Sequence, residues 1–157
     1  MAAQANGRPQ PTWLGIFCVG RARASAESAG VRQPEWSMNL RDVLAVLGGT
    51  VDSSEVDLEQ EIVAGAAADL MSDVLAFARP DCVLLTGLTH HQVVRTAEMA
   101  GIRAIVFVRG KRPPQETIRL AEEVGIPLLC TRFSLYEACG LLHSAGLPAS
   151  MPAPRSA

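Results

Sequence analysis

The sequence predicts a single α/β domain built on a mostly parallel sheet of about four to six strands, flanked by helices on both faces. Three observations support this fold class. Short, continuously apolar segments that suit buried strands alternate with segments of helical periodicity. Apolar residues make up 48% of the chain and charged residues 19%, a mixture that supports a hydrophobic core. At 157 residues, the chain has room for one domain of ordinary size.

The amino-terminal half of this domain begins with a helix over residues 40–47, in which leucine and valine recur at helical spacing before a Gly-Gly pair. An acidic stretch follows at residues 52–61, whose carboxylates repel one another and are expected to stay solvated. A buried strand is predicted over residues 61–67 and a short helix over residues 71–77.

The carboxyl-terminal half alternates strand and helix three times. Apolar strands are predicted over residues 82–86, 104–108 and 126–130. Helices are predicted over residues 90–100, 114–124 and 134–145. Strands separated by helices of about this length pair in parallel, through right-handed crossovers.

The two ends of the chain differ in composition from this middle part. Residues 1–37 are rich in arginine and contain both tryptophans, and Met38 stands directly before the first periodic segment. We therefore expect residues 1–37 to be a disordered leader or a mis-assigned start. The apolar stretch within them is short for a signal peptide and contains two glycines. The domain is expected to cover residues 38–148, and residues 149–157 are expected to form a flexible tail.

Composition also excludes several classes of partner. A net charge of −2 does not suit a protein that tracks the nucleic-acid backbone. No apolar run approaches the roughly 20 residues that a membrane span needs. The four cysteines form no C-x-x-C pair, which favours packing roles in a reducing cytoplasm. His90 and His91 are adjacent and would point about 100° apart on a helix, so no metal and no cofactor are expected.

Three turns follow predicted strands, and they contain the candidate ligand-binding residues. The carboxyl ends of parallel strands gather at one edge of a sheet, where ligands of open α/β sheets bind. We expect an anionic small molecule to bind there. The candidate residues are Thr86, Gly87, Thr89, His91, Arg109, Gly110, Lys111, Thr131, Arg132 and Ser134.

The helices after these turns begin with residues suited to helix capping. Thr89 with Gln92 and Ser134 with Glu137 both have the spacing of a capping box. Helix N-termini that face one edge present free N–H groups and positive dipole ends, which favour an anion. The same residues also serve as ordinary helix caps without any ligand, and the sequence leaves both interpretations open.

Motifs for covalent chemistry are missing from the sequence. It contains no G-x-S-x-G elbow, and the segment around Lys111 lacks the upstream glycine and following hydroxyl of a G-x-x-x-x-G-K-[ST] phosphate loop. No carboxylate pair lies in the three turns. We therefore assign no catalytic residue and expect no enzyme. The alternative is a small cytosolic enzyme of phosphoryl or acyl transfer that uses the same turns.

Residues 38–148 resemble the DRTGG domain. The resemblance is carried by VLLTGLTHHQVVRTA at residues 83–97, AIVFVRGKRPP at residues 104–114 and GIPLLCTRFSLYEA at residues 125–138. Its most specific features are the GIP before the last strand, the threonine at that strand's end and the capped final helix. One motif departs from the pattern, because residues 86–91 stand where a glycine-Asp-Arg motif is expected.

DRTGG domains occur as the amino-terminal domain of HPr kinase/phosphorylase, in phosphotransacetylases, between the CBS modules of some pyrophosphatases, and as stand-alone proteins, which this chain resembles. The resemblance implies a non-catalytic regulatory domain, commonly dimeric, that senses an anionic small molecule such as an adenine nucleotide or acts as a regulatory partner subunit. We expect a homodimer in which the first helix packs on a second copy through Leu40, Val43 and Leu47.

Overall fold

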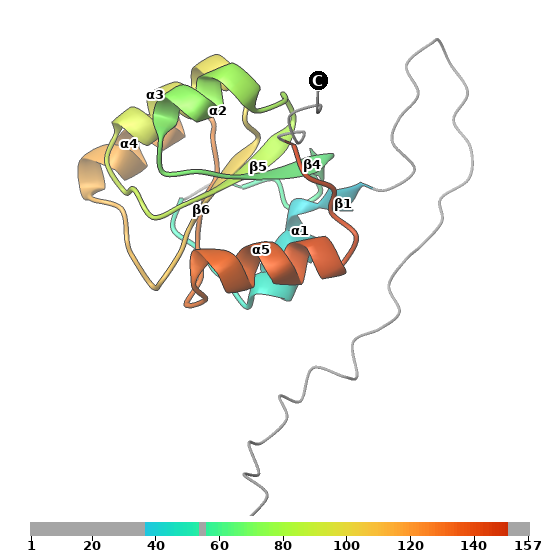
Figure 1. Ribbon diagram of the computed structural model, residues 1–157. Coiled ribbons are helices and arrows are strands. Elements are labelled where there is room, and N and C mark those ends of the chain that lie inside the picture. Colours follow the sequence, from blue (N-terminus) through green and yellow to red (C-terminus); the bar gives the residue numbers. More distant parts are fainter. Residues whose placement is uncertain (1–36, 54–55, 151–157) are drawn as a thin grey trace, which may run out of the picture. The chain divides into compact units, whose positions relative to one another are not determined.

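A five-stranded sheet forms the framework of the computed structural model, which describes residues 37–53 and 56–150 (Figure 1). The strands lie in the order β2-β7-β6-β5-β4. Their bounds are β2 Thr50–Val51, β4 Ala64–Ala67, β5 Cys82–Thr86, β6 Ala104–Phe107 and β7 Leu128–Cys130. The last four are parallel, and β2 is antiparallel to β7. This arrangement confirms the predicted fold class.

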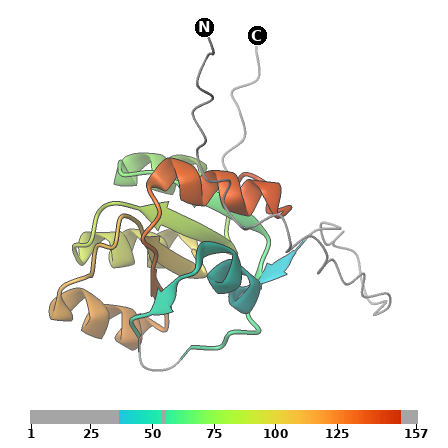
Figure 2. The same ribbon diagram turned by 90° about the horizontal axis from the view of Figure 1, so that it is seen from below.

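Five helices cover the two faces of the sheet. They are α1 Leu40–Leu47, α2 Met71–Phe77, α3 Gln92–Ala100, α4 Gln115–Val124 and α5 Leu135–Ser144. Figures 1 and 2 show α2, α3 and α4 on one face and α1 and α5 on the other. Successive side chains of a strand point to opposite faces. Leu84 therefore packs with the first group of helices, while Val83 and Leu85 pack with the second.

The segment predicted as one strand over residues 61–67 is divided between two sheets. β3 (Glu61–Ile62) pairs antiparallel with β1 (Met38–Asn39), and only β4 joins the main sheet. The antiparallel edge strand β2 was not predicted. Two residues are too few to show the alternation that identifies a strand.

The expected dimer surface on α1 was wrong. Leu40, Val43 and Leu47 are 0%, 1% and 2% exposed, and they form part of the core between α1, α5 and the sheet. The apolar stripe of α1 is buried within one chain, because α1 covers the sheet face that α2, α3 and α4 leave uncovered. A second copy would have to pack elsewhere.

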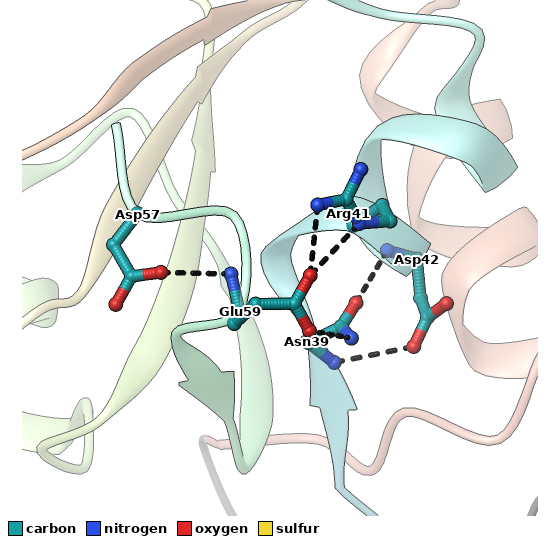
Figure 3. Close-up of polar contacts among 5 residues, drawn as sticks. All are labelled: Asn39, Arg41, Asp42, Asp57 and Glu59. Carbon is teal, nitrogen blue, oxygen red and sulfur yellow. Dashed lines mark hydrogen bonds and ion pairs between the residues drawn. The ribbon is translucent and has the colours of Figure 1, made fainter. Parts of the chain in front are cut away.

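Asp57, Glu59 and Glu61 of the acidic stretch are exposed, as expected, and two of them also have hydrogen-bond partners, as Figure 3 shows. Glu59 accepts two hydrogen bonds from Arg41, at 2.9 and 2.8 Å, and a third from the amide of Asn39. Asp57 accepts from the Glu59 N–H at 2.9 Å. Asn39 caps α1 through a capping box with Asp42. We call these five residues the α1 clamp, and its one cation, Arg41, offsets part of the negative charge of the acidic stretch.

The carboxyl-terminal end of the described chain lies along β4. The Gly65 N–H donates to the Pro148 carbonyl at 2.8 Å, and the Ser150 N–H donates to the Gly65 carbonyl at 2.7 Å. The buried hydroxyl of Ser150 accepts from the Arg79 N–H. Backbone hydrogen bonds therefore continue to residue 150, two residues past the domain boundary expected at residue 148. The expectations for the leader and for the end of the tail concern residues 1–36 and 151–157, outside the described part.

Candidate functional site

Gly87 lies at the centre of the candidate site, in the turn after β5. The Asp69 carboxylate, two residues after β4, accepts from the Thr86 hydroxyl at 2.9 Å and from the Gly87 N–H at 2.7 Å. The Lys111 ammonium, from the turn after β6, donates to the Gly87 carbonyl. A Cβ at residue 87 would lie 3.3 Å from both Arg109 Nη2 and Asp69 Oδ2. We call these five residues the strand-end cluster, and only glycine leaves it this compact.

Asp69 is stabilised as an anion within this cluster. The hydrogen bond from the Gly87 N–H is the main cause that lowers the pKa of Asp69, and burial opposes it. The Thr86 hydroxyl and the charges of Lys111 and Arg109 lower the pKa further. The carboxylate is therefore ionised at neutral pH, and it organises the turn after β5.

The turn after β6 is fastened to the turn after β7. Arg109 and Gly110 both have left-handed backbones, with φ of 62° and 65°, and the Lys111 N–H closes the turn on the Val108 carbonyl at 3.3 Å. The Arg109 N–H donates to the Phe133 carbonyl at 2.8 Å, and the Gly110 N–H donates to the turn after β7. The backbone N–H groups of this turn are thus already used, while the side chains of Arg109 and Lys111 are exposed.

The turn after β7 contains two predicted site residues with structural roles. Thr131 is buried, and its hydroxyl donates to the Leu47 carbonyl at 2.8 Å. Ser134 and Glu137 form the predicted capping box of α5, which confirms that prediction. The Ser134 hydroxyl is the main cause that lowers the pKa of Glu137. The Ser134 hydroxyl thus accepts from the Glu137 N–H and donates to the Glu137 carboxylate, and only Arg132 of this turn has an exposed charge suited to a ligand.

The predicted capping box of Thr89 with Gln92 was wrong. His91 precedes α3 with a helical backbone and makes no side-chain capping bond. A capping residue needs an extended backbone, as Ser134 has. The Thr89 carbonyl instead accepts from the Thr117 hydroxyl at 3.0 Å, which ties this turn to α4.

The two histidines lie near this turn but form no metal site. Their ring centroids are 5.3 Å apart, and both residues precede α3, so the helical geometry used in the sequence argument does not apply to them. His91 Nδ1 lies 3.6 Å from a carboxylate oxygen of Glu116, and both side chains are exposed. In residues 37–53 and 56–150, no group of three or more histidine, cysteine or acidic side chains could hold a metal ion.

A second polar cluster surrounds the thiol of Cys130, at the end of β7. The thiol donates to Asp52 at 2.8 Å, and Arg112 lies 3.4 Å from the other oxygen of this carboxylate. Burial raises the pKa of Cys130 to about 12, and the hydrogen bond to Asp52 adds to the effect. The thiol stays protonated at neutral pH, so it is a poor nucleophile.

The geometry of the strand-end cluster favours binding over catalysis. The hydroxyl of Thr86 donates to Asp69, as a nucleophile donates to its base, but Thr86 is 0% exposed. The lowered pKa of Asp69 makes it a weak base at neutral pH. The space between α1 and the sheet is lined mainly by apolar residues such as Val43, Leu47 and Leu129, and it includes no residue of the strand-end cluster.

Comparison with known families identifies the domain. The family model of the DRTGG domain matches residues 42–145, which is more than half of the chain. The chain belongs to the DRTGG domain family. In this DRTGG domain the turn after β5 lacks the expected Asp-Arg pair, and Asp69 and Arg109 approach Gly87 from the neighbouring turns instead.

Among solved structures, the DRTGG domain is similar to the CBS and DRTGG domains of the regulatory region of Clostridium perfringens pyrophosphatase, complexed with its activator diadenosine tetraphosphate. The TM-score is 0.54 at 16% identity, over 74% of this chain and 51% of that chain. The chain thus spans about half of that structure, and the likeness shows a shared fold. No curated protein matches the sequence. Within the described residues, no helix has the length and apolar character to span a membrane.

Asp69 is the residue of the strand-end cluster that the sequence reasoning missed. The signal was present, because Asp69 lies two residues after the strand predicted over residues 61–67. The rule that assigned the other three turns to one edge applies equally to this fourth turn.

Proposed function

We propose that this DRTGG domain is a non-catalytic regulatory module that binds an anionic small molecule, with an adenine nucleotide as the first candidate. The site is the edge where β5, β6 and β7 end. The observation that carries the proposal is Arg109, an exposed guanidinium on a left-handed backbone beside Gly87. A left-handed conformation costs a non-glycine residue about 1–2 kcal/mol. Strain of this kind is concentrated at binding and switch sites.

The charges of the strand-end cluster support an anion. The strand-end cluster contains two cations, Lys111 and Arg109, and one carboxylate, Asp69. Both hydrogen bonds that this carboxylate accepts come from the turn after β5. The Arg109 guanidinium donates no hydrogen bond to another residue of the described part. Two cations therefore remain for phosphate or carboxylate oxygens, which form charge-assisted hydrogen bonds with them.

The choice of an adenine nucleotide rests on the similar pyrophosphatase region, which is complexed with diadenosine tetraphosphate. The same proposal includes a homodimer and a regulatory partner protein. It also includes a cytoplasmic location, which the free thiols of Cys82, Cys130 and Cys139 support.

Calorimetric titration with ATP, AMP and diadenosine tetraphosphate tests the proposal. We expect Arg109→Asn and Arg132→Ala each to weaken binding by roughly tenfold or more, which is the loss of one charge-assisted bond. Arg119→Gln, which removes an exposed cation on α4, is the control and should leave binding unchanged. Absence of heat with all three ligands at millimolar concentration would contradict the proposal and favour a protein partner.

A further inference from the structure

Two exposed aromatic rings lie directly after the β7 turn. Aromatic residues make up only 4% of the chain, and Phe107 shows their usual place, in the core. Phe133 is 37% exposed and Tyr136 is 89% exposed, on either side of the Ser134 cap. Exposed rings of this size have no role in the core, and they are common where a surface recognises a partner or a ligand.

Backbone hydrogen bonds hold the segment of Phe133 next to the cationic turn, and Tyr136 follows three residues later at the start of α5. The Arg109 N–H donates to the carbonyl of Phe133 itself, and the Gly110 N–H donates to the carbonyl of Thr131. The strained turn that presents Arg109 and Lys111 thus rests on the segment that presents the two rings.

The capping box of α5 determines which part of a ligand meets which group. The Glu137 carboxylate places a negative charge at the α5 N-terminus. It accepts hydrogen bonds from the Ser134 N–H at 3.0 Å and from the Ser134 hydroxyl at 2.7 Å. A phosphate at this helix end would be repelled by that carboxylate. The anionic part of a ligand is therefore directed toward Arg109 and Lys111, and an uncharged planar part toward the rings.

We propose that Phe133 and Tyr136 form a stacking platform for the base of a nucleotide whose phosphates bind Arg109 and Lys111. This inference rests on the proposed function. It names the residues that recognise the base of the nucleotide. Aromatic side chains stack on any base, because every base has a π face. Since the overlap grows with the size of the base, purine nucleotides should bind more tightly than pyrimidine nucleotides.

The test compares ATP, CTP and inorganic tripolyphosphate by calorimetry, on the full chain and on leucine variants. We expect Tyr136→Leu and Phe133→Leu each to weaken ATP binding by about fivefold or more and to leave tripolyphosphate binding unchanged. Phe77→Leu removes a 60% exposed ring on α2 and is the matched control, expected to change neither. Melting curves of all variants exclude a loss of folding as the cause.

The outcomes separate the inference from the proposed function. If tripolyphosphate binds as tightly as ATP, or if the leucine variants bind ATP as the wild type does, the platform is refuted and the anion site remains. Equal affinities for ATP and CTP also contradict the platform. If neither ATP nor tripolyphosphate binds, the proposed function is refuted and the platform with it.

Discussion

The α1 clamp and the strand-end cluster are both polar clusters of five residues, but they use their charges differently. In the clamp, the one cation, Arg41, pairs with Glu59, and Asp42 and Asp57 bind backbone N–H groups of the same segments (Figure 3). In the strand-end cluster, the one carboxylate, Asp69, binds the turn after β5.

Two cations accompany that single carboxylate, and one of them sits on a strained backbone. In the clamp the charged groups fasten segments of the chain to one another, whereas the strand-end cluster has one cation more than it has carboxylates, which is the basis of the proposed anion site.

The largest effect on stability is expected for Asp69→Ala. The substitution removes the acceptor of the buried Thr86 hydroxyl and of the Gly87 N–H, so unfolding free energy should fall by about 2 kcal/mol. Asp57→Ala, in the clamp, removes one exposed acceptor and should cost less than about 1 kcal/mol. Urea denaturation measures both. Equal losses would show that the carboxylate of the strand-end cluster has no special structural role.

Removal of the α1 cap should have the next largest effect. Asn39→Ala breaks the capping box and the contact with Glu59, and it should lower the unfolding free energy by about 1 kcal/mol. Nucleotide binding should stay unchanged, because the α1 clamp stabilises the fold and lies outside the proposed site. Ser134→Ala breaks the matched cap of α5 and provides a comparison beside the proposed site. A change of affinity in Asn39→Ala would contradict the division between the two clusters.

A smaller effect, dependent on pH, is expected for Asp69→Asn. The amide oxygen can still accept both bonds, since both go to one oxygen of Asp69, so this variant removes the charge alone. The folded-state pKa of Asp69 lies below its ordinary value of 3.8. Its stabilising contribution is therefore fully present above that pH and is lost as the pH falls through the folded pKa. The wild type should lose its advantage over Asp69→Asn in acid, and an unchanged difference would contradict this.

The smallest effect on stability is expected for Arg109→Asn. Asparagine tolerates the left-handed conformation better than arginine does, so the unfolding free energy should be unchanged or up to about 1 kcal/mol higher. Thermal unfolding measures this change, and the same variant is expected to bind nucleotide less tightly. A clear loss of stability would show that Arg109 stabilises the fold and is not kept for a ligand.

The parallel core of the fold could be predicted because its strands are continuously apolar and are separated by periodic helices. Short elements could not be predicted, since β1, β2 and β3 have two residues each. Burial of the α1 stripe could not be predicted either. An apolar stripe does not reveal whether it packs on its own chain or on another, and Leu40 and Val43 pack on the sheet.

The candidate site was predictable where it depended on strand order and not where it depended on backbone conformation. Consecutive strands β5, β6 and β7 bring the three turns together, as expected. The patterns at Thr89 and Ser134 look alike in the sequence, yet Ser134 directly precedes its helix with an extended backbone, whereas α3 starts later and follows His91, whose backbone is helical. Likewise, the left-handed conformation of Arg109 has no signal in its residue type, because arginine rarely adopts it.

The segment that lies along β4 has a consequence for how copies of the domain can meet. β4 is the outermost parallel strand, and small residues such as Gly65 offer little side-chain protection to its open edge. Edges of this kind recruit strands from other molecules and promote aggregation. Residues 148–150 occupy both backbone groups of Gly65, while the opposite end of the sheet is the two-residue strand β2. The last described residues thus leave neither backbone group of Gly65 free to pair with a strand of another molecule.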